Sequence, residues 1–167
     1  MAKQKKSKLN SMRVLEAHDV PYEVFFYPPM RHSGAQVAEL LGAPLEQICK
    51  TLVVQRERGK PLLVMVTSDH QLNLKRLATS IGEKKLRMAP HREAERLTRL
   101  QVGGISALAL LNRGFDIFID QAAMAQSRVY VSAGQRGINL CLATQDLLRV
   151  TGARLVEATD YKGGMNE

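Results

Sequence analysis

The sequence predicts one compact mixed α/β domain, in which a curved, barrel-like mixed sheet is surrounded by helices. Strand-like runs occur both as a hairpin and singly between helical segments, which favours a mixed sheet over a doubly wound parallel one. The chain has 167 residues, 45% of them hydrophobic, enough for one core. No repeat or linker divides it. We expect a basic flexible tail at 1–8, one domain at 9–158 and a flexible tail at 159–167.

The N-terminal third is predicted to hold two helices with a strand between them. Apolar residues recur at helical spacing over residues 8–18. Aromatic and β-branched side chains favour a strand at 22–27, which two prolines end. Ser33 and Gln36 are spaced as a capping box that opens the next helix, and a glycine closes it. Pro44 starts another helical turn.

The middle of the chain is predicted to contain a hairpin, a helix, a short strand and a second helix. Apolar runs at 51–55 and 62–67 flank the turn sequence RERGK. Asn73 caps a helix that ends at a glycine. A short strand follows at 85–88, and Pro90 then opens a charged helix that extends to about residue 98.

The C-terminal third is predicted to hold three strands and a last helix. The strands are expected at 115–120, 129–132 and 138–142. Asn139 is expected to point outward from the last strand. Thr144 is expected to cap the final helix.

Composition narrows the class of protein and of partner. The net charge is +8 and the isoelectric point is near 9.8. This balance indicates either a solvated basic surface or a polyanionic partner such as RNA. Aromatic residues are only 5% and Trp is absent, which argues against an aromatic platform that stacks bases.

The sequence lacks the features of membrane-spanning, secreted and metal-binding proteins. No stretch approaches the length of a membrane span, and the charged N-terminus lacks the apolar region of a secretory signal. Cys49 and Cys141 lie in apolar strings, which indicates buried thiols in a reducing, cytoplasmic compartment. No metal-ligand spacing is present, so we expect no metal and no cofactor.

Two loops of small residues and one lysine are the candidate site. The loops are GGIS at 103–106 and SAGQRG at 132–137. Such loops expose backbone N–H groups that can hold an anion or a developing oxyanion, although either can be a simple turn. Lys50 begins an apolar strand, so its ammonium either reaches out to solvent or faces a ligand. Ser106 is expected to cap a helix that follows the first loop.

Three further residues border these segments. Tyr27 ends a strand, and its hydroxyl is a candidate for the lining of a cleft. Ser132 ends the strand VYVS, where the second loop begins. Arg136 in that loop is expected either to pair with a phosphate or to be solvated.

The order and spacing of several motifs resemble the YbaK/EbsC family of free-standing aminoacyl-tRNA deacylases, which is related to the editing domain of bacterial prolyl-tRNA synthetase. The resemblance covers residues 9 to 157. The motifs are KTL at Lys50, LNLKRLA at 72–78, GEKKLRMA at 82–89, AERLT at 94–98, VGGIS at 102–106, FIDQAA at 118–123 and YVSAGQRG at 130–137.

The resemblance implies the YbaK/prolyl-tRNA synthetase-associated domain fold and removal of an amino acid from mischarged tRNA, with Cys-tRNA(Pro) first among the substrates. It implies that Lys50 and Gly103 are the catalytic residues, at the tRNA 3′ end and the substrate carbonyl. It implies a pocket without a protein nucleophile, because the substrate thiol attacks its own ester. The acceptor end of mischarged tRNA is the expected partner, with prolyl-tRNA synthetase a further candidate. The expected substrate-binding residues are Tyr27, Gly104, Ile105, Ser106, Ser132 and Arg136.

Two departures from the family pattern keep other functions open. The family has GGxSPxG where this chain has Ala107 and Ala109 in place of Pro and Gly. The loop loses a fixed φ and a flexible position, which leaves the amino-acid preference open. One alternative is a tRNA- or synthetase-binding module without catalysis. Another is a metal-dependent phosphate-ester enzyme, although no carboxylate cluster suited to Mg²⁺ is evident.

Overall fold

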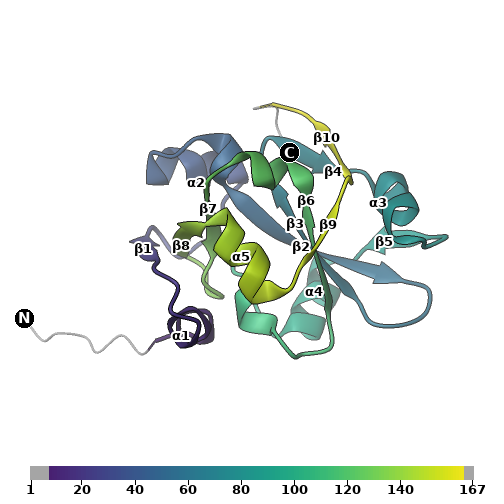
Figure 1. The fold of residues 1–167 in the computed structure, drawn as a ribbon, viewed down its shortest axis with the longest axis horizontal. Coiled ribbons are helices and arrows are strands. Elements are labelled where there is room, and N and C mark those ends of the chain that lie inside the picture. Colours follow the sequence, from purple (N-terminus) through teal and green to yellow (C-terminus); the bar gives the residue numbers. More distant parts are fainter. Residues whose placement is uncertain (1–7, 164–167) are drawn as a thin grey trace, which may run out of the picture.

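The computed structural model describes residues 8–163, which form a five-stranded mixed sheet, two smaller antiparallel sheets and surrounding helices (Figure 1). The mixed α/β class is confirmed. Residues 1–7 and 164–167, which hold most of the expected N-terminal tail and part of the expected C-terminal one, lie outside the described residues.

The five-stranded sheet has the order β5-β2-β3-β6-β9. Strand β2 pairs antiparallel with β3 and with β5, whereas β6 pairs parallel with β3 and with β9. The predicted hairpin is therefore present as β2 and β3. The strands of this sheet are β2 Cys49–Arg56, β3 Leu62–Thr67, β5 Leu86–Met88, β6 Asp116–Asp120 and β9 Arg154–Val156.

The remaining strands form two smaller antiparallel sheets. The first has the order β1-β8-β7, and a parallel bridge between Ile48 and Tyr130 joins it to the start of β2. The second pairs β10 with β4. Their strands are β1 Glu23–Phe26, β7 Arg128–Ser132, β8 Ile138–Ala143, β4 His70–Leu72 and β10 Thr159–Tyr161.

The helices begin and end at caps that the sequence largely marks. The capping box is present, since the Ser33 hydroxyl accepts from the Gln36 N–H and the Gln36 side chain accepts from the Ser33 N–H. The Asn73 side chain accepts from the Arg76 N–H at 3.1 Å. The helices are α1 Asn10–Ala17, α2 Gly34–Leu41, α3 Leu74–Ile81, α4 His91–Thr98 and α5 Thr144–Thr151, with 3₁₀ turns at Leu45–Gln47, Leu108–Leu110 and Gln121–Ala125.

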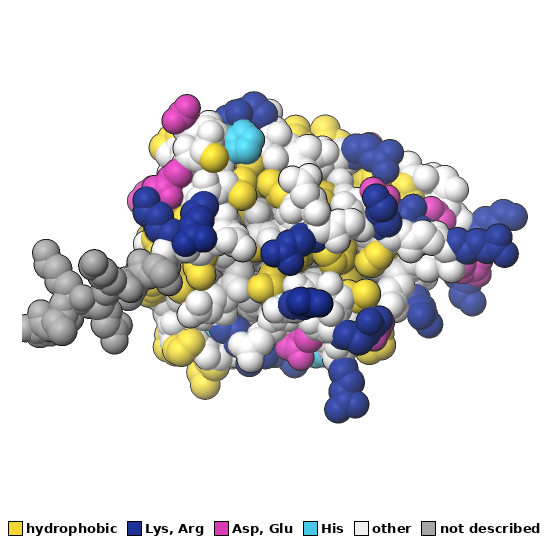
Figure 2. Space-filling model, turned by 90° about the horizontal axis from the view of Figure 1, so that it is seen from below, with side chains coloured by type: hydrophobic (Ala, Val, Ile, Leu, Met, Phe, Trp, Pro, Cys, Tyr) yellow, Lys and Arg dark blue, Asp and Glu magenta, His cyan; other side chains and the backbone are white. Residues whose placement is uncertain are grey.

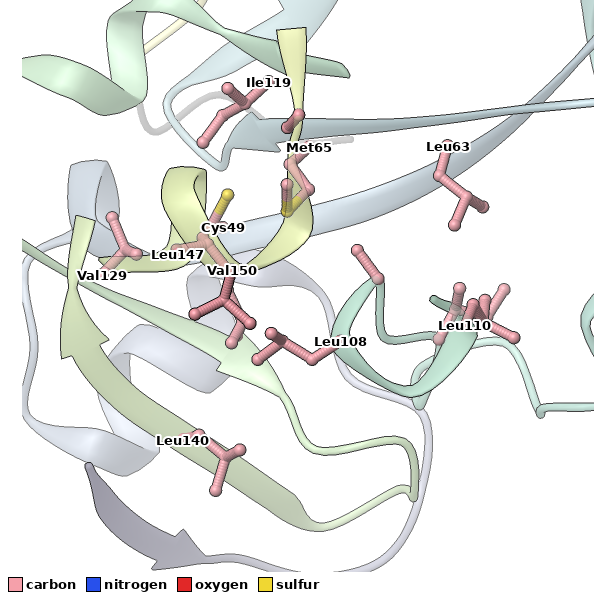
Figure 3. Close-up of a cluster of buried hydrophobic side chains, with 14 of the residues drawn as sticks. Cys49, Leu63, Met65, Leu108, Leu110, Ile119, Val129, Leu140, Leu147 and Val150 are labelled. Carbon is pink, nitrogen blue, oxygen red and sulfur yellow. The ribbon is translucent and has the colours of Figure 1, made fainter. Parts of the chain in front are cut away.

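The core lies on both faces of β3, whose six residues are all buried. Leu63 and Met65 point into the larger cluster, together with side chains from the 3₁₀ turn at Leu108–Leu110 and from α5 (Figure 3). Val64 belongs to a second cluster beneath α3. A strand covered on both faces has a continuous apolar sequence, as this one does.

The structure corrects two large-scale expectations. The strands do not close into a barrel, because the five-stranded sheet keeps β5 and β9 as its edges. Residues 159–161, expected to begin a flexible tail, form β10. The buried carboxylate of Asp120 anchors this segment by accepting from the Ala158 N–H at 2.7 Å and from the Thr159 hydroxyl at 2.8 Å.

Three local expectations are also wrong. Thr144 does not cap α5, because its hydroxyl donates to the Gln126 carbonyl at 2.6 Å. Asn139 does not point outward to solvent but is buried, with its side-chain amide donating to the Tyr27 hydroxyl at 2.7 Å. The helix expected after Ser106 is only the 3₁₀ turn at Leu108–Leu110, although the Ser106 hydroxyl does accept from the Ala109 N–H at 3.3 Å.

Candidate functional site

A cleft of about 540 Å³ brings together segments that are far apart in the sequence. One wall is the start of β2 and α2, and another is β5 and the beginning of α4. The loop at 102–105 and the ends of β1, β7 and β8 complete it. Five of the eight predicted site residues line this cleft: Tyr27, Lys50, Gly103, Ile105 and Ser132.

Lys50 is the second residue of β2 and is partly buried at the cleft. Gly34, at the start of α2, packs against its aliphatic chain: a Cβ added to Gly34 would lie 2.9 Å from Lys50 Cε and 2.3 Å from Ser68 Oγ. Ser68 is buried, and its hydroxyl has no hydrogen-bond partner among residues 8–163. The lysine chain therefore passes through a narrow space that only a glycine at position 34 leaves open.

The GGIS loop divides its two glycines between two roles. Gly103 is exposed, has a φ of +95° and lines the cleft. Its N–H has no hydrogen-bond acceptor in the part of the chain that the structure describes. Gly104 is buried, and its N–H donates to the Gln101 carbonyl at 2.8 Å. Of the two amides, only that of Gly103 is left to bind an anion.

Gly104, Ser106 and Arg136 do not line the cleft but lie behind it. A Cβ on Gly104 would lie 2.8 Å from the backbone nitrogen of Arg136, so the two small-residue loops are packed backbone to backbone. Arg136 Nε donates to the Val102 carbonyl at 2.7 Å. Ser106 is almost fully buried. These three residues hold the Gly103 loop in place, and the structure does not bring them to the cleft surface.

Tyr27, Ser132 and Asn139 form a polar group at one end of the cleft. Asn139 Nδ2 donates to the Tyr27 hydroxyl at 2.7 Å. Ser132 is the cross-strand partner of Asn139, and its hydroxyl accepts from the Gly134 N–H at 3.2 Å. Burial raises the pKa of the Tyr27 phenol, and the Asn139 amide offsets part of this rise. The phenol is therefore neutral at physiological pH and keeps a proton to donate.

The mouth of the cleft is crossed by one side-chain contact. Arg31 Nη1 donates to His91 Nδ1 at 3.2 Å, and both residues are exposed. Arg31 follows the Pro28-Pro29 loop, whereas His91 is the first residue of α4. The pair joins the two sides of the opening, and it requires a neutral imidazole that accepts at Nδ1.

The thiol next to the candidate lysine in sequence is buried in the hydrophobic core. Cys49 lies beside Lys50, and burial, together with the negative charge of Asp120, raises the pKa of this thiol to about 12. A thiol with this pKa is protonated at neutral pH, and a protonated thiol is a poor nucleophile.

The residues described carry no metal-ligand cluster of three or more His, Cys, Asp or Glu side chains. Within the same residues, every helix is too short or too polar to cross a membrane.

Comparison with known proteins places this chain in a family. The aminoacyl-tRNA editing domain family matches residues 28–150. A proposed Cys-tRNA(Pro)/Cys-tRNA(Cys) deacylase of Enterococcus faecalis, EbsC, is 34% identical over 95% of this chain and 98% of its own length. The chain belongs to the aminoacyl-tRNA editing domain family.

The chain is also similar to part of a larger protein and to two solved structures. The proline–tRNA ligase of Pelobacter propionicus is 27% identical over 79% of this chain, which spans 23% of that ligase. The hypothetical protein APE2540 has a TM-score of 0.83 and 25% identity over 90% of this chain and 99% of its own. A proposed trans-editing enzyme for prolyl-tRNA synthetase has a TM-score of 0.78 at 24% identity, over 93% of this chain and 99% of its own, and supports the fold.

The structure shows whether the loop needs the proline and glycine that Ala107 and Ala109 replace. Ala107 has a φ of −62°, which lies within the range that a proline ring imposes. Ala109 does not have a positive φ, so no glycine is required there. The GGIS loop therefore keeps a compatible backbone without the proline and glycine of the family pattern.

Sequence reasoning missed Asn139, Gly34, Arg31 and His91. A signal for Asn139 was available, because the hairpin of β7 and β8 puts it opposite Ser132, and cross-strand partners share one face of a sheet. The other three carry no local signal. Their role depends on α2 and α4 lying on opposite sides of the cleft, which is a tertiary property.

Proposed function

We propose that this protein is a trans-acting deacylase that clears mischarged tRNA, with Cys-tRNA(Pro) as its principal substrate. The observation that carries the proposal is the meeting of Lys50 with Gly103, 53 positions later in the chain, at one cleft. The similarity to EbsC over nearly the whole of both chains supports the same substrate class. We expect the protein to act in the cytoplasm, where charged tRNA is used.

In this proposal the protein positions an ester that is already reactive. The Lys50 ammonium binds the negatively charged 3′ end of the tRNA beside the scissile ester. The Gly103 N–H donates to the carbonyl oxygen and stabilises the negative charge that develops on it in the transition state. The neutral Tyr27 phenol and the Ser132 hydroxyl contact the bound aminoacyl group. Precise placement by such groups lowers the barrier without a covalent enzyme intermediate.

The nucleophile for a cysteinyl ester is the substrate's own thiol. Its thiolate attacks the ester carbonyl, a C–S bond forms, the bond between the carbonyl carbon and the ribose oxygen breaks, and that oxygen takes up a proton. The products are a thiolactone and deacylated tRNA. The state of Cys49 supports this assignment, because this thiol is buried in the core and its raised pKa keeps it protonated at neutral pH. For an amino acid without a thiol, water is the nucleophile and the overall reaction is hydrolysis.

The experiment compares Cys-tRNA(Pro), Ala-tRNA(Pro) and Pro-tRNA(Pro), with release of the labelled amino acid followed over time. We expect rapid loss of cysteine and intact Pro-tRNA(Pro). Faster loss of alanine than of cysteine would contradict the thiol-assisted step and indicate water as the nucleophile. If the protein binds all three tRNAs and releases the amino acid from none, the proposed catalysis is contradicted. A tRNA-binding module without catalysis would then be the better interpretation.

A further inference from the structure

We propose that the surface formed by β5 and α4 binds the phosphate backbone of the tRNA acceptor arm. This inference rests on the proposed function and says where the RNA of that substrate lies. We call this surface the α4 basic surface and define it by six exposed side chains: Lys84, Lys85, Arg87, Arg92, Arg96 and Arg99.

Charge is concentrated in this segment. Residues 84–99 contain six basic and two acidic residues, a net charge of +4, which is half of the +8 of the whole chain. Both carboxylates are already engaged, since Glu93 pairs with Arg96 and Glu95 accepts from the Val102 N–H at 2.9 Å. Among residues 8–163, Arg96 is the only member of the surface with a salt-bridge partner. The remaining positive charge is therefore available to an external anion.

Two arginines lie on one face of α4, and a third follows at its C-cap. Arg92 and Arg96 have the i, i+4 spacing that puts side chains on one face of a helix, whereas Arg99 is the C-cap and has a left-handed φ of +60°. A helical turn separates Arg92 from Arg96 by about 6 Å along the axis and Arg99 lies beyond them, so the three can contact more than one phosphate of an RNA strand. The opposite face is buried, with Ala94 and Thr98 turned inward. Figure 2 shows Lys and Arg side chains distributed over the face of the molecule on which α4 lies.

The position of Arg92 in the first turn of α4 does not stabilise the helix. This arginine lies in the first turn of α4, where the partial positive charge of the helix N-terminus disfavours a cation. Its position is unfavourable for the free protein and favourable when a phosphate binds between the arginine and the helix N-terminus. Arg96 and Arg99 by contrast lie near the C-terminal end, where cations are favoured.

The α4 basic surface is continuous with the cleft. Met88, Ala89, His91 and Ala94 belong to the same β5–α4 segment and line the cleft wall. Arg31 extends the positive charge across the mouth through its contact with His91. An acceptor arm that lies along α4 is thus directed with its 3′ end toward Lys50.

The test measures binding of an uncharged tRNA(Pro) transcript by fluorescence anisotropy over a range of salt concentrations. The variant Arg92→Gln/Arg99→Gln removes two cations that lack ion-pair partners in the described residues and leaves the Arg96–Glu93 pair intact. Its control, Arg13→Gln/Lys75→Gln, removes two exposed cations from α1 and α3, away from the cleft. Thermal unfolding of both variants verifies the fold.

We expect the α4 variant to bind the transcript about tenfold more weakly and to lower the slope of log affinity against log salt by about 2, one for each lost phosphate contact. The control should follow the wild type. Equal affinity and slope in both variants would overturn the proposal. The transcript carries no amino acid, so failure of deacylation does not affect this result.

Discussion

At the scale of single residues, the position of Lys50 depends on two neighbours that pack around its side chain. Gly34 leaves room for the lysine chain, and the buried Ser68 side chain closes the other side of the same space. A methyl group at position 34 would lie 2.6 Å from Ser68 Cβ, which belongs to a short, inflexible side chain. A substitution at either packing partner is therefore expected to displace the Lys50 ammonium.

Gly34→Ala is expected to lower the free energy of unfolding by about 1–3 kcal/mol through overpacking and to reduce deacylation by displacing Lys50. The second variant, Gly34→Ala/Ser68→Gly, removes both Ser68 atoms that the new methyl would meet, so it should recover part of the stability and activity. Urea unfolding and the rate of cysteine release measure the two effects. A single variant equal to the wild type in both would contradict this packing.

Cys49 gives a prediction for alkaline pH. Its pKa is raised from 9.0 to about 12, so the folded protein binds the thiol proton more tightly than the unfolded chain does. Stability from this group is complete below pH 9 and is lost as the pH rises from about 9 toward 12, at about 1.4 kcal/mol for each unit of pKa difference.

The measurement is urea unfolding of wild type and Cys49→Ala at pH values from 8 to 10.5. The wild type should lose stability more steeply than the variant above pH 9, because the variant lacks the thiol. Parallel curves would show that the thiol ionises as readily in the folded protein as in the unfolded chain.

At the scale of elements, the helices and the long strands could be predicted because their signals are local. The capping box of α2 and the Asn73 cap of α3 are hydrogen bonds between residues three apart, which the sequence displays directly. Strands β4, β9 and β10 were missed: each has only three residues, too few for a strand pattern, and is formed by pairing with a distant segment. Strand β5 is as short and was the one three-residue strand of the described chain to be predicted. Thr144 was misread because its hydroxyl bonds to Gln126, a residue 18 positions earlier.

Contact between the two small-residue loops gives a prediction at this scale. Gly104→Ala would add a Cβ 2.8 Å from Arg136 N and 2.9 Å from Gln135 C, and backbone atoms cannot move as a side-chain tip can. We expect a loss of about 1–3 kcal/mol in unfolding free energy and a fall in kcat, because the Gly103 amide is displaced with the loop.

The matched control is Ala109→Gly, which changes the same segment and adds no atom. It should retain much more activity than Gly104→Ala. If Gly104→Ala deacylates at the wild-type rate, the close packing of the two loops is not needed to position Gly103.

At the scale of the whole molecule, the cleft is assembled from segments that only the complete fold brings together. Tyr27, Lys50, Gly103 and Ser132 come from different parts of the chain and line one cavity. Local chemistry marked each of them as a candidate, but periodicity and caps do not show that they meet, and it was the resemblance to a known family that joined them into one site. Gly104, Ser106 and Arg136 belong to the same motifs and were predicted to bind substrate. In the structure they pack against the Gly103 loop and do not line the cleft.

The most direct test of the central claim is the single-turnover rate of deacylation of Cys-tRNA(Pro) by wild type and by Lys50→Ala, with the fold of each verified by circular dichroism. A loss of one charge-assisted contact in the transition state predicts a rate about 100-fold lower in the variant, with little change in secondary structure. Deacylation by Lys50→Ala at the wild-type rate would contradict the assignment of this cleft as the catalytic site.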